Sequence, residues 1–241
     1  MHPAGPTLLL ASLLAGAPGY DWTRPHCFAY SPGEDGYACF DFAIGADLDP
    51  GLVDFERRAP VPDVAWHGRK AIALVHAAAG DAEPDELVIA EKPYDSDGPT
   101  VRPRSASAAR RLARQRGYKD APLSRRTLTS GRWVRLRGVR LRFTTELREG
   151  DASAHAIGSL QLRCTADAEP VELLDRSYGE FAVAYAHRSA PSLVVGIRNW
   201  SGGEGSGYYT VEYVHIDLKA RCPAAAQDPP HAGSPAARTR P

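Results

Sequence analysis

Short runs of alternating hydrophobic and polar residues recur along the chain and are separated by turn-forming residues. In the last run Tyr209, Val211 and Tyr213 share one face. The aliphatic residues Val214 and Ile216 share the other face, because side chains alternate along a strand. Strands are predicted at residues 28–30, 37–44, 71–76, 87–91, 133–145, 156–164, 180–187, 193–199 and 208–218. The pattern predicts a mainly-β fold, an antiparallel sandwich or barrel-like sheet.

One segment has the pattern of a short helix instead. Ser105 or Ser107 can cap it, residues 108–116 are good helix formers, and Gly117 can end it. Because Leu112 is its main large apolar residue, we expect this helix to bury little area and to lie on the surface.

The two ends of the chain differ from its centre. Residues 8–14 form an apolar run followed by small residues, which is typical of an export signal, although no Lys or Arg precedes it. We expect a signal peptide over residues 1–19, one β-rich domain over residues 20–222 with a basic insertion at about 102–126, and a disordered tail over residues 223–241. No run reaches the ~18 apolar residues of a transmembrane helix, so we expect a secreted or periplasmic protein without a transmembrane segment. Arginine far outnumbers lysine, as in proteins from GC-rich bacterial genomes.

Four cysteines agree with an exported protein. They are even in number and lack the C-x-x-C spacing of zinc or redox sites. Turn residues lie midway between Cys27 and Cys39, so a hairpin would place these two opposite each other. The remaining pair, Cys164 and Cys222, would tie the end of the last strand back to the sheet. We therefore expect the disulfides Cys27–Cys39 and Cys164–Cys222, with four reduced thiols as the alternative.

Positive charge is concentrated in one window of an otherwise neutral chain. Residues 102–142 hold fourteen Lys and Arg and one acid, Asp120, which gives a net charge of +13. The rest of the chain carries fifteen basic and 28 acidic residues, a net charge of −13. This window either pairs with the acidic parts of the chain or presents a positive surface to an anionic partner.

The second half of this window reads as a strand with four alternating arginines. Arg135 and Arg137 lie at odd positions, and Arg140 and Arg142 at even positions. A one-residue β-bulge at Gly138 would restore the register and place all four arginines on one face. The alternative is a tight turn at Gly138 between two short strands.

Such a face would suit phosphate or carboxylate groups, since guanidinium groups bind these oxygens in a bidentate manner. The expected partners are anionic polysaccharide or lipid head groups. Specific nucleic-acid binding is not expected, because the window lacks interleaved aromatic residues that stack bases. Arginines that are solvated or paired with acids are the structural alternative.

No catalytic or metal motif stands out. The chain lacks Gly-x-Ser-x-Gly, His-x-His and His-Glu-x-x-His, and the Gly-rich segment around Ser206 reads as a hairpin loop. Residues 95–98 resemble the start of a calcium loop without its remaining ligands. We therefore expect no cofactor and a non-enzymatic binding or structural protein. The alternatives are an extracellular hydrolase whose site forms only in three dimensions and a purely structural domain with internally cancelled charges.

Overall fold

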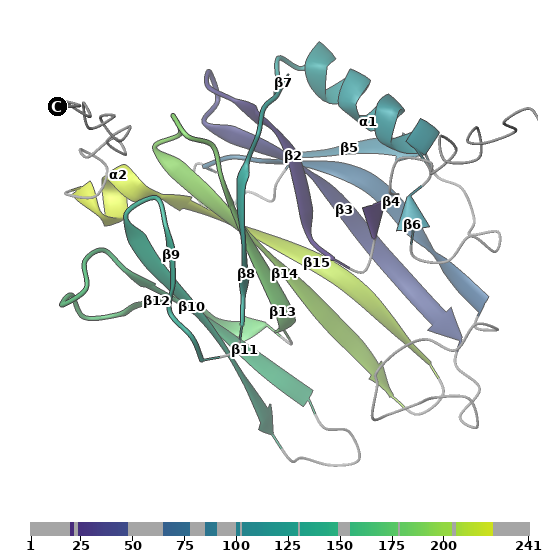
Figure 1. Ribbon diagram of the computed structural model, residues 1–241. Helices are drawn as coiled ribbons and strands as arrows, with labels where there is room; N and C mark the ends of the chain where they lie inside the picture. Colours follow the sequence, from purple (N-terminus) through teal and green to yellow (C-terminus); the bar gives the residue numbers. More distant parts are fainter. Residues whose placement is uncertain are drawn as a thin grey trace, which may run out of the picture.

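The computed structural model consists mainly of antiparallel strands, as the alternation predicts (Figure 1). It describes residues 20–21, 24–47, 65–77, 85–90, 100–101, 103–129, 131–148, 155–177, 179–203 and 206–223. The predicted signal peptide, most of the predicted tail and the calcium-like segment therefore lie outside the described residues. No helix in the described ranges is long and apolar enough to cross a membrane.

The largest sheet in the described part of the chain has nine strands. Its main path runs β5-β4-β3-β15-β14-β13-β8, while β2 pairs with β3 and β7. The strands are β2 (His26–Ser31), β3 (Gly36–Asp47), β4 (Ala65–Val75), β5 (Asp85–Ala90), β7 (Lys119–Asp120), β8 (Ser124–Leu128), β13 (Gly179–Ala186), β14 (Ser192–Gly203) and β15 (Ser206–Asp217).

A second, four-stranded sheet has the order β12-β11-β10-β9. Its strands are β9 (Val134–Leu136), β10 (Val139–Arg148), β11 (His155–Arg163) and β12 (Val171–Ser177). Two short strands, β1 (Tyr20–Asp21) and β6 (Thr100–Val101), pair with each other. A short helix α2 (Leu218–Arg221) follows β15 and is capped by the Asp217 side chain, which accepts hydrogen bonds from two backbone amides of the first turn.

The two large sheets pack face to face around an aliphatic core. Leu141, Phe143 and Leu160 of the smaller sheet are buried against the larger sheet. The larger sheet contributes Val195 and Ile197 to the same cluster, together with alanines of β13. This arrangement is a sandwich, so the predicted fold class is confirmed.

Both predicted disulfides are present. Cys27 and Cys39 lie directly opposite each other in the hairpin of β2 and β3. Cys164 follows β11 and Cys222 follows α2, so their disulfide links the two sheets. The predicted pairing of Cys27 with Cys39 and that of Cys164 with Cys222 are thus both confirmed.

The predicted helix exists as α1 (Pro103–Gln115) and begins earlier than the capping serines suggest. Pro103 occupies the first turn, where its missing N–H removes no helical hydrogen bond. Gly117 has φ +86°, and the amides of Gly117 and Tyr118 donate to the carbonyls of Arg114 and Ala113. This is a Schellman motif, in which glycine is favoured because it adopts positive φ without strain.

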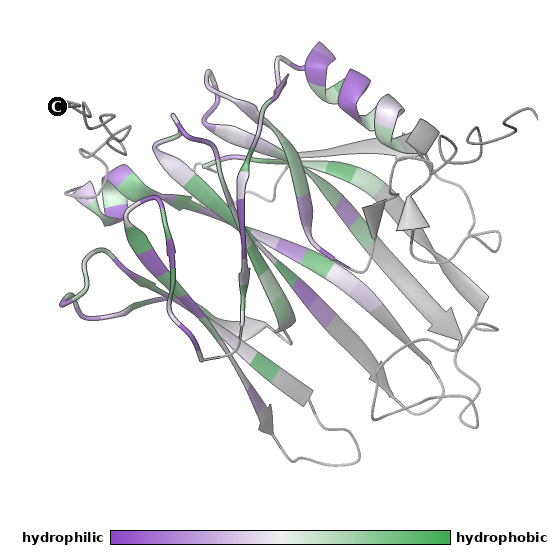
Figure 2. Ribbon diagram, in the orientation of Figure 1, coloured by the Kyte–Doolittle hydropathy of each residue, from purple (hydrophilic) through white to green (hydrophobic). Residues whose placement is uncertain are grey.

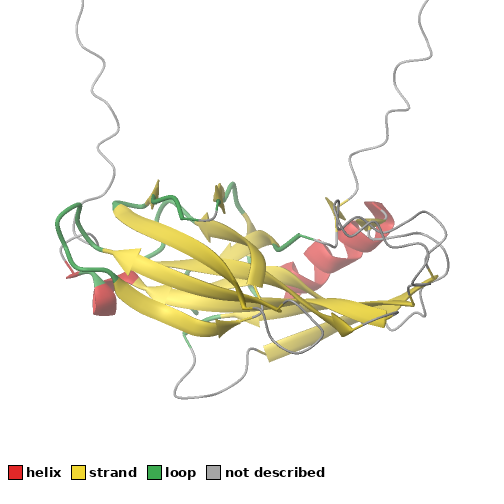
Figure 3. Ribbon diagram, turned by 90° about the horizontal axis from the view of Figure 1, so that it is seen from below, coloured by secondary structure: helices red, strands yellow, loops and turns green. Residues whose placement is uncertain are grey.

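The helix buries small residues. Ala106, Ala109 and Ala113 face a cluster that includes Phe40 and Ile72 of the large sheet. Figure 3 shows α1 lying along one side of the strands. We expected this helix to bury little area because it has few large apolar residues. Its alanines are nevertheless buried, because small side chains allow the helix to approach the sheet closely.

Candidate anion-binding surface

The basic strand of the sequence is a tight hairpin. β9 and β10 pair with Leu136 opposite Val139 and Arg135 opposite Arg140. The two residues between them, Arg137 and Gly138, both have positive φ, at 52° and 81°. Two-residue turns of this kind match the natural twist of a hairpin. The predicted β-bulge at Gly138 is therefore wrong, and the alternative of a turn between two short strands is confirmed.

The hairpin still places three of the predicted arginines on one face. Residues directly opposite each other share a face, so Arg135 and Arg140 lie together, and Arg142 follows two positions along β10. Between them Leu141 points the other way and is fully buried in the core of the sandwich. The arginines therefore occupy the outer face of the four-stranded sheet.

A fourth arginine, which the sequence did not single out, joins this group. Arg163 of β11 lies directly opposite Arg140, so Arg135, Arg140 and Arg163 form a row across three strands. Like charges directly opposite each other destabilise a sheet. We call Arg135, Arg140, Arg142 and Arg163 the arginine face. In the sequence Arg163 alternates with Leu160 and Leu162, which is a signal for a polar face, but only the strand register shows that Arg140 is its neighbour.

Trp133 and Gln161 hold two of these guanidinium groups. The guanidinium carbons of Arg142 and Arg163 lie 4.7 and 4.5 Å from the centroid of the Trp133 ring, within the range of cation–π attraction. Arg142 Nε and Nη2 also donate to Gln161 Oε1, at 3.1 and 2.6 Å. These contacts restrict the arginine side chains before any ligand binds.

The arginine face has no acidic partner within the described part of the chain: none of its four guanidinium groups forms an ion pair there. Arg163 Nε is buried and has no hydrogen-bond partner among the described residues. Two described acids also lie on this side of the sheet. Glu172 is opposite Gln161 on β12 and accepts a hydrogen bond from Ser159, and Glu146 lies further along β10. Unpaired guanidinium groups with fixed geometry can donate hydrogen bonds to the oxygens of an anionic ligand.

Arg137 lies apart from this face. Its guanidinium donates to the carbonyl oxygens of Arg188 and Ala190, the second at 2.8 Å, in the loop between β13 and β14. It therefore joins the β9–β10 hairpin to the larger sheet, and we leave it out of the candidate surface.

A second polar cluster surrounds the tip of the β2–β3 hairpin. Asp35 Oδ1 accepts hydrogen bonds from the hydroxyl groups of Tyr30 and Ser192, at 2.8 and 2.6 Å. His215 Nε2 lies 2.9 Å from the Asp35 carbonyl oxygen. Because Ser192 is completely buried, this serine cannot reach a substrate, and the cluster fixes the hairpin to β14 and β15.

The histidines whose side chains are described form no metal site. His187 and His215 both adjoin Tyr37: the His187 amide donates to the Tyr37 hydroxyl, and the centroids of the Tyr37 and His215 rings lie 6.4 Å apart. Burial raises the pKa of Tyr37 to about 12. Within the described ranges no group of three potential metal ligands is found. Ser206 lies at the start of β15, and its side chain is outside the described residues.

Comparison with known proteins finds none that is similar to this chain. It matches no protein-family model, no curated protein and no solved structure.

Proposed function

We propose that this protein is a secreted or periplasmic binding protein that holds an anionic polymer on its arginine face. The observation that carries the proposal is the row of Arg135, Arg140 and Arg163, which lies across three strands without an acidic partner in the described residues. Clustered like charges cost stability in the free protein. A bound anion removes this cost, because its negative charge offsets the repulsion among the arginines.

Acidic polysaccharide is the polymer that this surface suits best. Guanidinium groups spaced along and across strands can contact sulfate, phosphate or carboxylate groups repeated along a chain. The face belongs to a sheet and carries one tryptophan, whose ring is already in contact with Arg142 and Arg163. It therefore lacks the free aromatic platforms that single-stranded nucleic acids use. Two disulfides accord with an extracellular or periplasmic site of action.

Heparin chromatography tests the proposal. The full chain is compared with a variant carrying Arg135→Gln, Arg140→Gln and Arg142→Gln. The native protein is expected to elute late in a salt gradient, and the variant near the start. A control with Arg188→Gln, Lys219→Gln and Arg221→Gln removes the same charge from exposed positions outside the basic window and is expected to elute close to the native protein.

The outcomes separate the remaining functions. If the native protein passes through at low salt, the binding proposal fails, and a structural role or a hydrolase becomes the better hypothesis. If both variants lose retention equally, net charge rather than the arginine face explains binding, and the proposal fails too. Anionic vesicles of phosphatidylglycerol and phosphatidylcholine distinguish lipid head groups from polysaccharide.

A further inference from the structure

The helix α1 carries a second basic surface. Alanines are buried on the side that faces the sheet, with Leu112 partly buried beside them, and the exposed side carries Arg110, Arg111 and Arg114. Arg116, just after its last residue, is also exposed. The helix contains no Asp or Glu. Figure 2 shows the hydrophilic residues on the turns that face away from the sheet.

Arg114 is only weakly paired within the protein. Arg114 Nε lies 3.6 Å from Asp120 Oδ2, but the two side chains are 60% and 42% exposed. Exposed pairs of this kind contribute about 0–1 kcal/mol and are screened by salt. Neither Arg111 nor Arg116 forms an ion pair with any of the described residues. The guanidinium groups of Arg111 and Arg116 are therefore available to an external anion.

The second surface and the arginine face lie on opposite sides of the large sheet. β15 pairs with β14 without a register shift from Asp217 to Ser206, so its side chains alternate throughout. Tyr209, at an odd position, belongs to the cluster under α1. Ile216, at an even position, belongs to the core beneath the four-stranded sheet. The strands between the two surfaces keep one bound anionic group from contacting both.

We propose that α1 is a second, independent anion-binding surface, so that one molecule bridges two segments of acidic polysaccharide. This inference rests on the proposed function, since it assigns the same class of ligand to both surfaces. It adds that the protein cross-links its ligand. A protein that cross-links an anionic polymer organises that polymer in addition to binding it.

The stoichiometry of a short ligand tests the inference. A heparin tetrasaccharide is titrated into the full chain at low salt by calorimetry. The native protein is expected to bind two tetrasaccharides. A variant with Arg111→Gln, Arg114→Gln and Arg116→Gln is expected to bind one. Glutamine is nearly as good a helix former as arginine, so α1 should remain folded, which circular dichroism checks.

The variant of the arginine face separates this inference from the proposed function. With Arg135→Gln, Arg140→Gln and Arg142→Gln the protein is expected to bind one tetrasaccharide, through α1. If the native protein binds only one, and the α1 variant binds it equally well, the second surface is refuted while the proposed function stands. If the native protein binds none, both proposals fail.

Long heparin chains give a second readout. Cross-linking predicts light scattering that rises to a maximum at an intermediate ratio of protein to heparin and falls when either is in excess. Each triple variant is expected to lose this maximum. Binding without such a maximum in the native protein would show that one chain wraps around the molecule, which would overturn the bridging proposal.

Discussion

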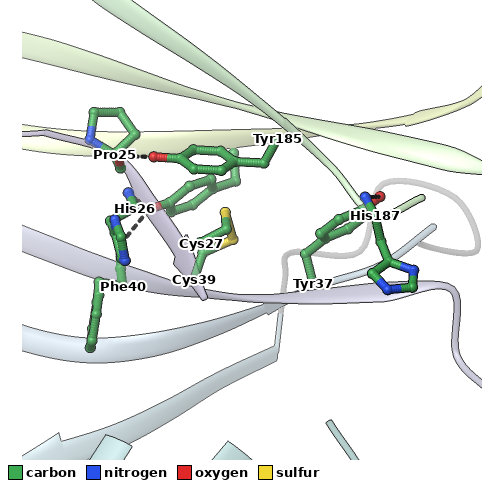
Figure 4. Close-up of a disulfide and its surroundings, with 9 residues drawn as sticks. Pro25, His26, Cys27, Tyr37, Cys39, Phe40, Tyr185 and His187 are labelled. Carbon is green, nitrogen blue, oxygen red and sulfur yellow. Dashed lines mark hydrogen bonds between the residues drawn. A yellow bond between two sulfur atoms is a disulfide. The ribbon is translucent and has the colours of Figure 1, made fainter. Parts of the chain in front are cut away.

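The surroundings of His26 oppose the positive charge of its imidazole. Its amide donates to the Tyr213 hydroxyl at 3.2 Å. Its ring stacks on Phe40, with centroids 5.8 Å apart, beside the Cys27–Cys39 disulfide (Figure 4). Burial, followed by the positive charges of Arg125 and Arg110, lowers the pKa of His26 from 6.5 to about 4. The protein therefore folds around a neutral imidazole next to the Cys27–Cys39 disulfide.

Acid should destabilise the protein through this histidine. The pKa in the folded state lies below that in the unfolded state, so the unfolded chain binds more protons between pH 6.5 and 4, and stability falls as pH drops through this window. From pH 7 to pH 5 the expected loss is about 2 kcal/mol. Urea denaturation at the two pH values measures it.

Two variants separate His26 from the other titrating groups. His26→Gln is expected to remove most of the loss of stability between pH 7 and pH 5. His187→Gln is expected to retain it, because His187 is less buried, although burial and the nearby Arg188 and Arg137 also lower its pKa. An unchanged pH dependence in His26→Gln would contradict this assignment.

At the scale of elements, the sequence predicted hairpins best where turn chemistry and alternation agree. The segment between Cys27 and Cys39 contains proline and glycine, and the structure confirms both the hairpin and its disulfide. The turn at Arg137 and Gly138 was harder to predict, because arginine is uncommon at positive φ. Hydrogen bonds from Arg137 to a loop about fifty residues away support that conformation, and local sequence cannot show them.

The candidate surface was predictable only in part. Alternation placed Arg140 and Arg142 together, because both belong to one regular strand. The contribution of Arg163 depends on the pairing of β10 with β11, and that of Trp133 on side-chain contacts across the sheet. Register between strands far apart in sequence is set by packing of the whole core, so one sequence does not reveal it.

Variants of Arg137 and Arg140 test which arginine stabilises the fold and which one binds the ligand. Arg137→Gln is expected to lower the free energy of unfolding by about 1–2 kcal/mol, since it leaves two loop carbonyls without their donor. It should weaken heparin binding much less than Arg140→Gln does. Arg140→Gln should leave stability unchanged or raise it, because it relieves repulsion with Arg135 and Arg163.

Chemical denaturation and a heparin binding titration on both variants check these expectations. Equal losses of affinity in the two variants would show that Arg137 belongs to the binding surface after all. A large loss of stability in Arg140→Gln would show that Arg140 is a structural residue.

At the scale of the whole molecule, the net charge is zero, but positive and negative charges are concentrated in different parts of the sequence. The window of residues 102–142 carries +13, and it supplies both α1 and the β9–β10 hairpin. These elements lie on opposite faces of the large sheet, and the Cys164–Cys222 disulfide holds the two sheets of the sandwich together. The fold thus distributes one basic stretch of sequence over two surfaces.

The salt dependence of heparin binding tests the central claim most directly. The dissociation constant of the full chain for a fluorescent heparin oligosaccharide is measured over a range of salt concentrations, beside the variant Arg135→Gln, Arg140→Gln, Arg142→Gln. If the arginine face contacts the anions, the slope of log Kd against log salt should be about two to three units smaller in the variant. The variant forms fewer contacts with anionic groups, so its binding releases fewer counterions. Equal slopes and equal affinities in the two proteins would contradict the account.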